Sequence, residues 1–331
     1  MIFGKRYLHI VLIVLISIGF TLFIASTNTE DDKNQQAFND GYKIHSVKLP
    51  SSINFANETI NLDEADLIER YDRELLTNIY WQSQTLLFIK RAHKLFPVIE
   101  NILKEQGVPD DFKYLCVAES GLQFQVVSPS NATGYWQFLE STGKRYGLQI
   151  NDDIDERYHL EKSTMAACAY FKEAYNEFKS WSLVAASYNM GIDGVRKQLA
   201  LQKVTRYHDL YLNAETSRYL FRILAIKSVI EKPNEFGFYI AHEQLYKPAH
   251  VYRIRVDSNI ADIAQYALDN NTNYKILKLN NPWIRKNSLM VNQSIYYLTL
   301  PISQIKSTDY FSKLVNDTIN LEDTHYTSSS K

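Results

Sequence analysis

An apolar run opens the chain and sets its first prediction. The run extends from Tyr7 to Ala25, with Lys5 and Arg6 before it and acidic residues after it. It is long enough to cross a bilayer and longer than the usual core of a signal peptide. Because basic flanking residues stay in the cytoplasm, the rest of the chain is predicted to lie on the other side of the membrane. Residues 1–26 are therefore predicted to be a transmembrane anchor, or a signal segment if a peptidase cuts at the small residues near Ala25.

The next part of the chain changes from a polar to a helical pattern. Residues 27–62 are rich in Asn, Asp, Ser and Thr without periodicity, which predicts a flexible tether. From Asp63 to Gly107, apolar side chains recur at steps of three and four residues, as is typical of amphipathic helices. The clearest recurrence is Leu67, Ile68, Tyr71, Leu75 and Ile79.

Three further helices are predicted downstream. Ser163 is predicted to be the N-cap of an Ala-rich helix that extends to Ser180. A second helix covers residues 181–191 and stops at a glycine, and a third covers residues 215–231 before a proline. Strand-like alternation is nearly absent, so the chain up to about residue 245 is predicted to be mainly α.

The pattern changes again after Phe238. Residues 251–256 and 295–301 have the character of strands, and the segments 260–268 and 274–279 between them have that of short helices. This β-α-α-β order predicts a small α+β module. The Thr/Ser-rich tail at 303–331 is predicted to be disordered.

Composition and charge narrow the classes of protein. The 331 residues, 45% hydrophobic and 22% charged, suit one large globular domain or two modest ones. A net charge of −1 argues against nucleic acid as a partner. The two cysteines, Cys116 and Cys168, lie in apolar helical contexts, and we predict buried thiols, with a disulfide as the alternative in an exported protein. Neither they nor the eight histidines have the spacing of a metal site, so no metal or other cofactor is expected.

One carboxyl group has the sequence surroundings of a general acid. A helix is predicted to begin around residues 109–111, where a proline and two acids suit the first turn. Phe112, Leu115 and Cys116 follow at helical spacing, and Glu119 falls on the same apolar stripe. Burial there raises the pKa of a carboxyl and keeps it protonated near neutral pH. The alternative is a capping contact or salt bridge at the end of a helix.

Short motifs on both sides of Glu119 give a resemblance. They are Glu119-Ser120, Gly134-Tyr-Trp-Gln137, Ala186-Ser-Tyr-Asn-Met-Gly191 and Glu215-Thr-Ser-Arg-Tyr219, with connecting residues such as Ser141-Thr-Gly-Lys-Arg-Tyr-Gly-Leu148. Each is weak alone, but in this order they resemble the lytic transglycosylases of the goose-lysozyme-like superfamily. The likeness is greatest to the membrane-bound murein transglycosylase D group and covers roughly residues 95–245.

The resemblance implies a fold and a division into domains. It implies a mainly α, lysozyme-like (SLT-type) catalytic domain over residues 63–245, with its core at 95–245. The module at 249–302 resembles a divergent LysM domain, a family that binds glycans containing N-acetylglucosamine. Asp257-Ser258-Asn259 stands where that family has a Gly-Asp-Thr turn. Glycan binding and a purely structural role both remain open for this module.

The resemblance also implies a reaction on peptidoglycan. In that reaction Glu119 first protonates the glycosidic oxygen between N-acetylmuramic acid and N-acetylglucosamine, and then, as a base, deprotonates the muramoyl C6 hydroxyl to close a 1,6-anhydro ring. Most glycoside hydrolases instead need a second carboxylate. The nearest acids along the chain, Asp152, Asp153, Asp155 and Glu156, are expected at a helix start or in surface ion pairs.

Six further site residues follow from matching the motifs position by position. Ser120 matches a residue that forms a hydrogen bond near the catalytic acid, and Gln137 matches an amide that contacts sugar. Tyr188 is expected close to the Glu119 carboxyl, with Asn189 beside it. Tyr219 matches a late tyrosine of the family, and Glu215 an acid near the groove. Ordinary core packing is the alternative for both tyrosines, and a helix N-terminal acid is the alternative for Glu215.

Three functions remain in competition. The first is a lytic transglycosylase, anchored on the periplasmic side of the inner membrane or exported to the periplasm if the N-terminal segment is cleaved. The second is a goose-type lysozyme that hydrolyses the same bond with water. The third is a non-catalytic scaffold that binds the cell wall. In each case the expected partner is peptidoglycan glycan strands, and the protein is expected to be a monomer.

Overall fold

The computed structural model describes residues 17, 33, 36, 41, 44–291 and 294–302. The predicted anchor at 1–26, apart from Ser17, and the predicted tail from 303 onward lie outside these residues. Within the described part, no helix is long and apolar enough to cross a membrane.

A β-hairpin precedes the first described long helix. Strand β1 (Ser52–Phe55) pairs antiparallel with β2 (Glu58–Asn61) through a tight turn at Ala56 and Asn57, whose φ angles are 51° and 67°. Ile53, Phe55 and Ile60 are buried, and the Phe55 ring lies 5.2 Å from that of Phe112. The prediction of a tether is therefore wrong for residues 52–61, because these apolar side chains pack onto the helical domain.

Two long helices follow the hairpin and meet at Trp81. Helix α2 (Ala65–Tyr80) buries four of the five side chains whose spacing predicted it, while Ile68 is exposed. Helix α3 (Gln82–Gln106) continues through Pro97 and ends at Gly107, which takes the left-handed conformation with φ 68°. The predicted helical region from Asp63 to Gly107 is thus confirmed as two helices.

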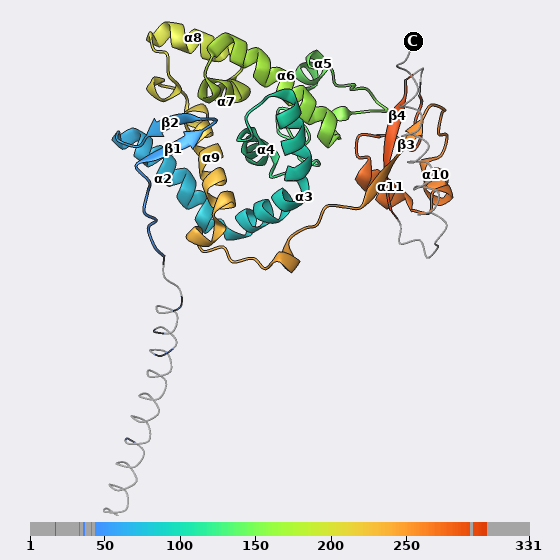
Figure 1. The fold of residues 1–331 in the computed structure, drawn as a ribbon, viewed down its shortest axis with the longest axis horizontal. Coiled ribbons are helices and arrows are strands. Elements are labelled where there is room, and N and C mark those ends of the chain that lie inside the picture. The colour runs from blue at the N-terminus through green and yellow to red at the C-terminus, as the bar shows by residue number, and fades with distance from the viewer. Residues whose placement is uncertain are drawn as a thin grey trace, which may run out of the picture. The chain divides into compact units, whose positions relative to one another are not determined.

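Helix α4 (Phe112–Ser120) lies in the middle of the helical domain and contacts α3 and α9 (Figure 1). Phe112, Leu115 and Cys116 are fully buried, which confirms the predicted apolar stripe. The helix stops at Gly121, where φ is 59° and a Cβ atom would lie 2.8 Å from the ring of Phe88. Both observations favour glycine at this position.

The remaining helices complete the helical domain (Figure 1). Contacts link α6 with α3 and α7, and α9 with α2, α4 and α7. Short 3₁₀ turns join several of the elements. The bounds are α5 Glu140–Arg145, α6 Leu160–Phe178, α7 Trp181–Met190, α8 Ile192–Gln202 and α9 Ala214–Glu231.

The predicted caps of α6 and α7 have different outcomes. Helix α6 begins at Leu160 with His159 at the N-cap, so the prediction of Ser163 as the cap is wrong. Ser163 lies inside the helix, and its hydroxyl donates to the His159 carbonyl at 2.7 Å. The hydroxyl therefore has a hydrogen-bond partner in the helix without acting as the cap. Helix α7 begins after Ser180, whose hydroxyl accepts the Leu183 N–H, and it ends before Gly191 as predicted.

The C-terminal module has the predicted β-α-α-β order. Its elements are β3 (Val251–Val256), α10 (Ile263–Asp269), α11 (Tyr274–Asn280) and β4 (Tyr296–Pro301), with β3 and β4 antiparallel. The buried amide of Asn281 joins α11 to β4, since Nδ2 donates to the Thr299 carbonyl at 2.7 Å and Oδ1 accepts the Thr299 N–H at 2.8 Å. Together with the helical domain, this module confirms the predicted fold class.

The acidic segment at 152–156 contacts the module. The Asp155 N–H donates to the Trp283 carbonyl at 2.9 Å, and Ile154 packs in the hydrophobic core of the module. Asp155 pairs with Arg157 at 2.7 Å, and Asp153 pairs with Lys286 at 2.6 Å. These acids are thus ion-paired as expected, although the Asp155–Arg157 pair is buried rather than on a solvated face.

Candidate active site

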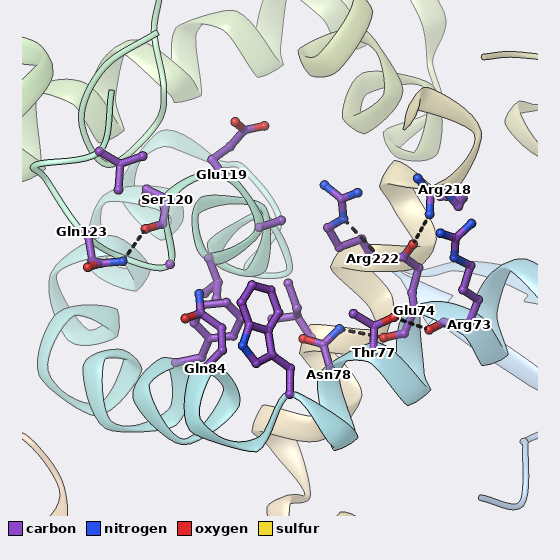
Figure 2. A pocket seen from close by; sticks show the side chains of 17 residues that line it. Arg73, Glu74, Thr77, Asn78, Gln84, Glu119, Ser120, Gln123, Arg218 and Arg222 are labelled. Carbon is purple, nitrogen blue, oxygen red and sulfur yellow. Dashed lines mark hydrogen bonds and ion pairs between the residues drawn. The ribbon is translucent and has the colours of Figure 1, made fainter. Parts of the chain in front are cut away.

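Glu119 lies in the last turn of α4 and lines a pocket of about 460 Å³. The other residues that line this pocket come from α4 itself, from α2, α3 and α9, from Trp81 between α2 and α3, and from the loop after α4. Figure 2 shows Glu119 and Ser120 on one side and three arginine side chains on the other. The pocket therefore combines one carboxyl at the end of an apolar helix with a group of cationic donors.

The Glu119 carboxyl is bound by Tyr219, whose hydroxyl donates to Oε1. Burial is the largest influence on this carboxyl and raises its pKa to about 7. The hydrogen bond from Tyr219 and the charge of Arg222 act in the opposite direction, and the charge of Glu215 adds to the effect of burial. A carboxyl with a pKa near 7 holds its proton for part of the time at neutral pH, as an acid that later acts as a base requires.

The loop that follows α4 is fixed to α4 and to α6 by polar contacts. The Ser120 hydroxyl donates to the Tyr135 carbonyl at 2.7 Å, and Trp136 is fully buried with its indole N–H on Thr164 at 2.9 Å. Gly134 has φ 81°, and a Cβ atom there would lie 2.1 Å from the Arg157 carbonyl oxygen. Only glycine fits this position, so the Gly134-Tyr-Trp-Gln137 motif has a structural reason for its first residue.

Gln137 uses its amide nitrogen within the loop. Nε2 donates to the carbonyls of Val126 and Gly134, both at 2.9 Å. These two bonds occupy both hydrogens of the amide and leave the oxygen Oε1 to accept from another group. Gln137 does not line the pocket around Glu119, and the expected sugar contact of its amide stays a prediction.

The two tyrosines of the motifs have different partners. The Tyr188 hydroxyl donates to the Trp136 carbonyl at 2.8 Å, whereas the Tyr219 hydroxyl donates to Glu119. Burial and the charge of Glu119 raise the pKa of both phenols well above the usual value, so both stay protonated as donors. Tyr219 is thus the tyrosine that binds the Glu119 carboxyl. Tyr188 instead binds the Trp136 carbonyl and so orients the loop after α4.

Asn189, near the end of α7, contacts Glu215 and Thr216 in the first turn of α9. Asn189 Oδ1 accepts from the Thr216 hydroxyl at 2.7 Å, and its Nδ2 donates to Glu215 at 3.3 Å. Glu215 is exposed, stands in the first turn of α9 and does not line the pocket around Glu119. Its position fits a helix N-terminal acid, and its charge still reaches Glu119 and raises the pKa of that carboxyl.

Several pocket residues had no signal in the sequence motifs. Arg73, Glu74, Asn78 and Trp81 come from α2 and its end, and Gln84 comes from α3. Arg218 and Arg222 come from α9. Arg218 stands inside the Glu215-Thr-Ser-Arg-Tyr219 motif, although no role was assigned to it there. Arg222 follows Arg218 by four residues, so helical spacing could have placed these two arginines on one face of α9.

The cysteines and acids of the described residues do not form a metal site. Cys116 and Cys168 are both buried free thiols, as predicted. Over residues 44–291 and 294–302, no group of three His, Cys, Asp or Glu side chains is arranged to hold a metal ion.

Similarity to known protein families agrees with the motifs. Residues 96–210 match the family described as "Transglycosylase SLT domain", and residues 252–304 match "Soluble lytic transglycosylase C-terminal LysM-like domain". The proteins named "Membrane-bound lytic murein transglycosylase D" from Escherichia coli strains K12 and O6:H1 are each 28% identical over 183 residues. That match covers 54% of this chain and 40% of each relative, so the chain matches less than half the length of these relatives. The chain therefore contains a region similar to the transglycosylase SLT domain, followed by a region similar to the C-terminal LysM-like domain of soluble lytic transglycosylases.

Proposed function

We propose that this protein is a peptidoglycan lytic transglycosylase that cleaves the β-1,4 bond between N-acetylmuramic acid and N-acetylglucosamine and leaves 1,6-anhydromuramoyl ends. The observation that carries the proposal is the Glu119 carboxyl, held by Tyr219 in a pocket, with a pKa of about 7. The match of residues 96–210 to the SLT domain supports the same reaction class.

In the first step Glu119 gives its proton to the glycosidic oxygen. The C1–O bond breaks, N-acetylglucosamine leaves with its new hydroxyl, and positive charge develops at muramoyl C1. The N-acetyl group of the substrate stabilises this centre. The Tyr219 hydroxyl then donates to a carboxylate rather than to a carboxylic acid, a stronger hydrogen bond that favours the step.

In the second step the Glu119 carboxylate takes the proton of the muramoyl C6 hydroxyl. The C6 oxygen forms a bond to C1, which closes the 1,6-anhydro ring and returns Glu119 to its acid form. No water is consumed, and one carboxyl serves as acid and then as base. This double role requires a pKa near the working pH, which burial supplies here.

The other carboxyl of the pocket supports this mechanism over hydrolysis. Glu74 is buried, and its two carboxyl oxygens are engaged in ion pairs with Arg218 and Arg222, each at 3.4 Å. A retaining hydrolase needs a free second carboxylate about 5–5.5 Å from the acid, and an inverting one needs a base for water. Glu74 is poorly suited to either task, which leaves Glu119 to act alone.

Digestion of purified sacculi with mass analysis of the products tests the proposal. The full-length protein is expected to release muropeptides with 1,6-anhydromuramoyl ends, which are lighter than reducing ends by one water. Reducing ends alone would identify a hydrolase instead. Binding without any released product would identify a non-catalytic scaffold.

The cellular setting is a separate proposal. We infer an enzyme held at the periplasmic face of the inner membrane by the apolar run at residues 7–25. The name of the two relatives, membrane-bound lytic murein transglycosylase D, supports this location. Cell fractionation, followed by detection of the protein with an antibody, tests this location. Full-length protein in the soluble cytoplasmic fraction would contradict the anchor.

A further inference from the structure

Three arginines face the pocket from the side opposite Glu119, and we call them the arginine cluster: Arg73, Arg218 and Arg222 (Figure 2). Arg73 is on α2, and the other two are on α9. The proposed reaction uses Glu119, Tyr219 and the loop fixed to α4, and it gives the arginine cluster no task. A cationic group of this size in a pocket for an uncharged sugar ring needs a separate reason.

Glu74 organises two members of the cluster. Its carboxylate is 4% exposed and lies 3.4 Å from Arg218 Nη1 through Oε1 and 3.4 Å from Arg222 Nε through Oε2. Arg218 Nε also donates to the Ala214 carbonyl at 2.7 Å. Each guanidinium has five N–H donors, so these contacts still leave most of the donors of both groups without a partner among the described residues. Arg73 precedes Glu74, is exposed, and its guanidinium has no ion pair among the described residues.

The balance of charge in the pocket is positive. Three guanidinium groups face two carboxyls, Glu74 and Glu119. Glu119 is neutral for part of the time near pH 7. Arg222 is near enough that its charge lowers the pKa of Glu119, so the cluster and the reacting carboxyl share one electrostatic environment. An anionic group of the ligand would therefore be attracted to this side of the pocket.

We propose that the arginine cluster binds a peptide carboxylate carried by the muramoyl residue, so that the enzyme selects peptide-substituted glycan strands over naked ones. This inference rests on the proposed function. A planar guanidinium pairs with a carboxylate through two parallel hydrogen bonds, which is the geometry that arginine provides and lysine does not. In peptidoglycan the peptide is attached through the lactyl group of the same muramoyl ring whose C1 reacts, so its carboxylates are carried by the sugar that enters the pocket for cleavage. The uncharged rings of a naked strand offer the cluster no partner.

Kinetics on three matched substrates test the inference. The substrates are peptide-bearing strands, the same strands with peptide carboxylates converted to amides, and naked strands from which an amidase has removed the peptides. For the full-length protein, KM is expected to be lowest on the first substrate and about tenfold higher on the other two, since a hydrogen bond between charged groups contributes that much to affinity. The value of kcat is expected to change little.

Arg73→Gln is the decisive variant, because its side chain holds no ion pair among the described residues and its loss should not disturb folding. It is expected to raise KM about tenfold on peptide-bearing strands and to leave both other substrates unchanged. Arg73→Lys should recover part of the affinity and less of the selectivity. Arg196→Gln, an exposed arginine on α8, is the control and is expected to leave KM unchanged on all three substrates.

Two outcomes separate this inference from the proposed function. If the wild-type protein produces anhydromuramoyl ends from all three substrates with equal KM, or if Arg73→Gln raises KM equally on all three, the carboxylate site is wrong and the reaction stands. If the wild-type protein produces no such ends from any substrate while the folded protein binds sacculi, the proposed function itself is wrong.

Discussion

The hydroxyl of Tyr219 donates to Glu119 Oε1, and this bond joins the last turn of α4 to the first half of α9 across 100 residues of sequence. Tyr219 is 2% exposed, so its hydroxyl is shielded from water where it meets the carboxyl. The bond fixes the direction of the acid and sets its pKa together with burial.

The rate of bond cleavage is expected to fall on the alkaline side of pH 7. Glu119 must be protonated to act as the acid, and burial raises its pKa to about 7. Above that pH the protonated fraction decreases about tenfold per pH unit, so kcat/KM should fall with a slope of about −1. Measurement of kcat/KM from pH 5 to pH 9 on a soluble peptidoglycan fragment checks this. A flat profile up to pH 9 would mean that another group supplies the proton.

Tyr219→Phe is expected to move this alkaline limb to higher pH. The Tyr219 hydrogen bond stabilises the carboxylate and lowers the pKa of Glu119, so its removal raises that pKa further. The maximal rate should drop by about tenfold, since the acid also loses its orientation and the stronger bond formed during the step. Tyr207→Phe is the matched control, because its buried hydroxyl donates to the backbone carbonyl of Thr216 at 2.6 Å and has no contact with the acid. An unshifted limb in Tyr219→Phe would contradict the assigned pair.

The sequence predicted the helices and strands whose apolar residues recur at regular spacing within the element itself. The stripe of Phe112, Leu115 and Cys116 is visible as spacing and is buried as expected, and Glu119 follows on it. The strands and helices of the C-terminal module were also predicted within a few residues, because alternation and turn residues mark them locally.

Features that depend on contacts between distant segments were missed. The hairpin at 52–61 looks polar in sequence, and only the contact of Phe55 with Phe112 shows why it folds. Glu74 and Arg222 are 148 residues apart, and nothing in either helix alone predicts that they meet. One sequence alone carries no signal for such a pair, so the arginine cluster is visible only in the structure.

The buried carboxyl of Glu119 should make stability depend on pH. Between about pH 4.5 and pH 7 the folded protein holds a proton that the unfolded chain has lost, so the free energy of unfolding decreases as the pH rises through this range. Glu119 as a whole residue is half-buried, so we expect about 2 kcal/mol rather than the full value of the shift. Glu119→Gln cannot titrate, and its stability relative to wild type should increase by that amount from pH 4 to pH 8. Urea unfolding at both pH values measures it, with Glu105→Gln at an exposed carboxyl as the control.

Deletion of residues 249–331 should destabilise the helical domain without removing its chemistry. The deletion exposes Ile154, which packs in the core of the module, and leaves the Asp155 N–H without its partner Trp283. A thermal midpoint several degrees lower is expected, because about 1–3 kcal/mol is lost with such contacts. The pocket around Glu119 contains no residue of the module, so kcat at low temperature should remain. A folded truncated protein without any activity would show that the module forms part of the groove.

A comparison of Glu119→Gln with Glu215→Gln tests whether one carboxyl acts as both the general acid and the general base. The amide keeps the size of Glu119 and a hydrogen-bond acceptor for Tyr219, but it neither gives nor takes a proton. Loss of general acid catalysis alone costs about two to four decades in rate, and the same group also serves as the base, so we expect the upper end or beyond.

Glu215 is exposed and influences Glu119 only through its charge, so Glu215→Gln should lower the pKa of Glu119 and cost less than about tenfold at neutral pH. Release of anhydromuropeptides from sacculi, followed by mass analysis, gives both rates, and binding of each variant to sacculi shows that the groove is intact. Equal losses in the two variants would point to a pair of carboxylates and therefore to hydrolysis.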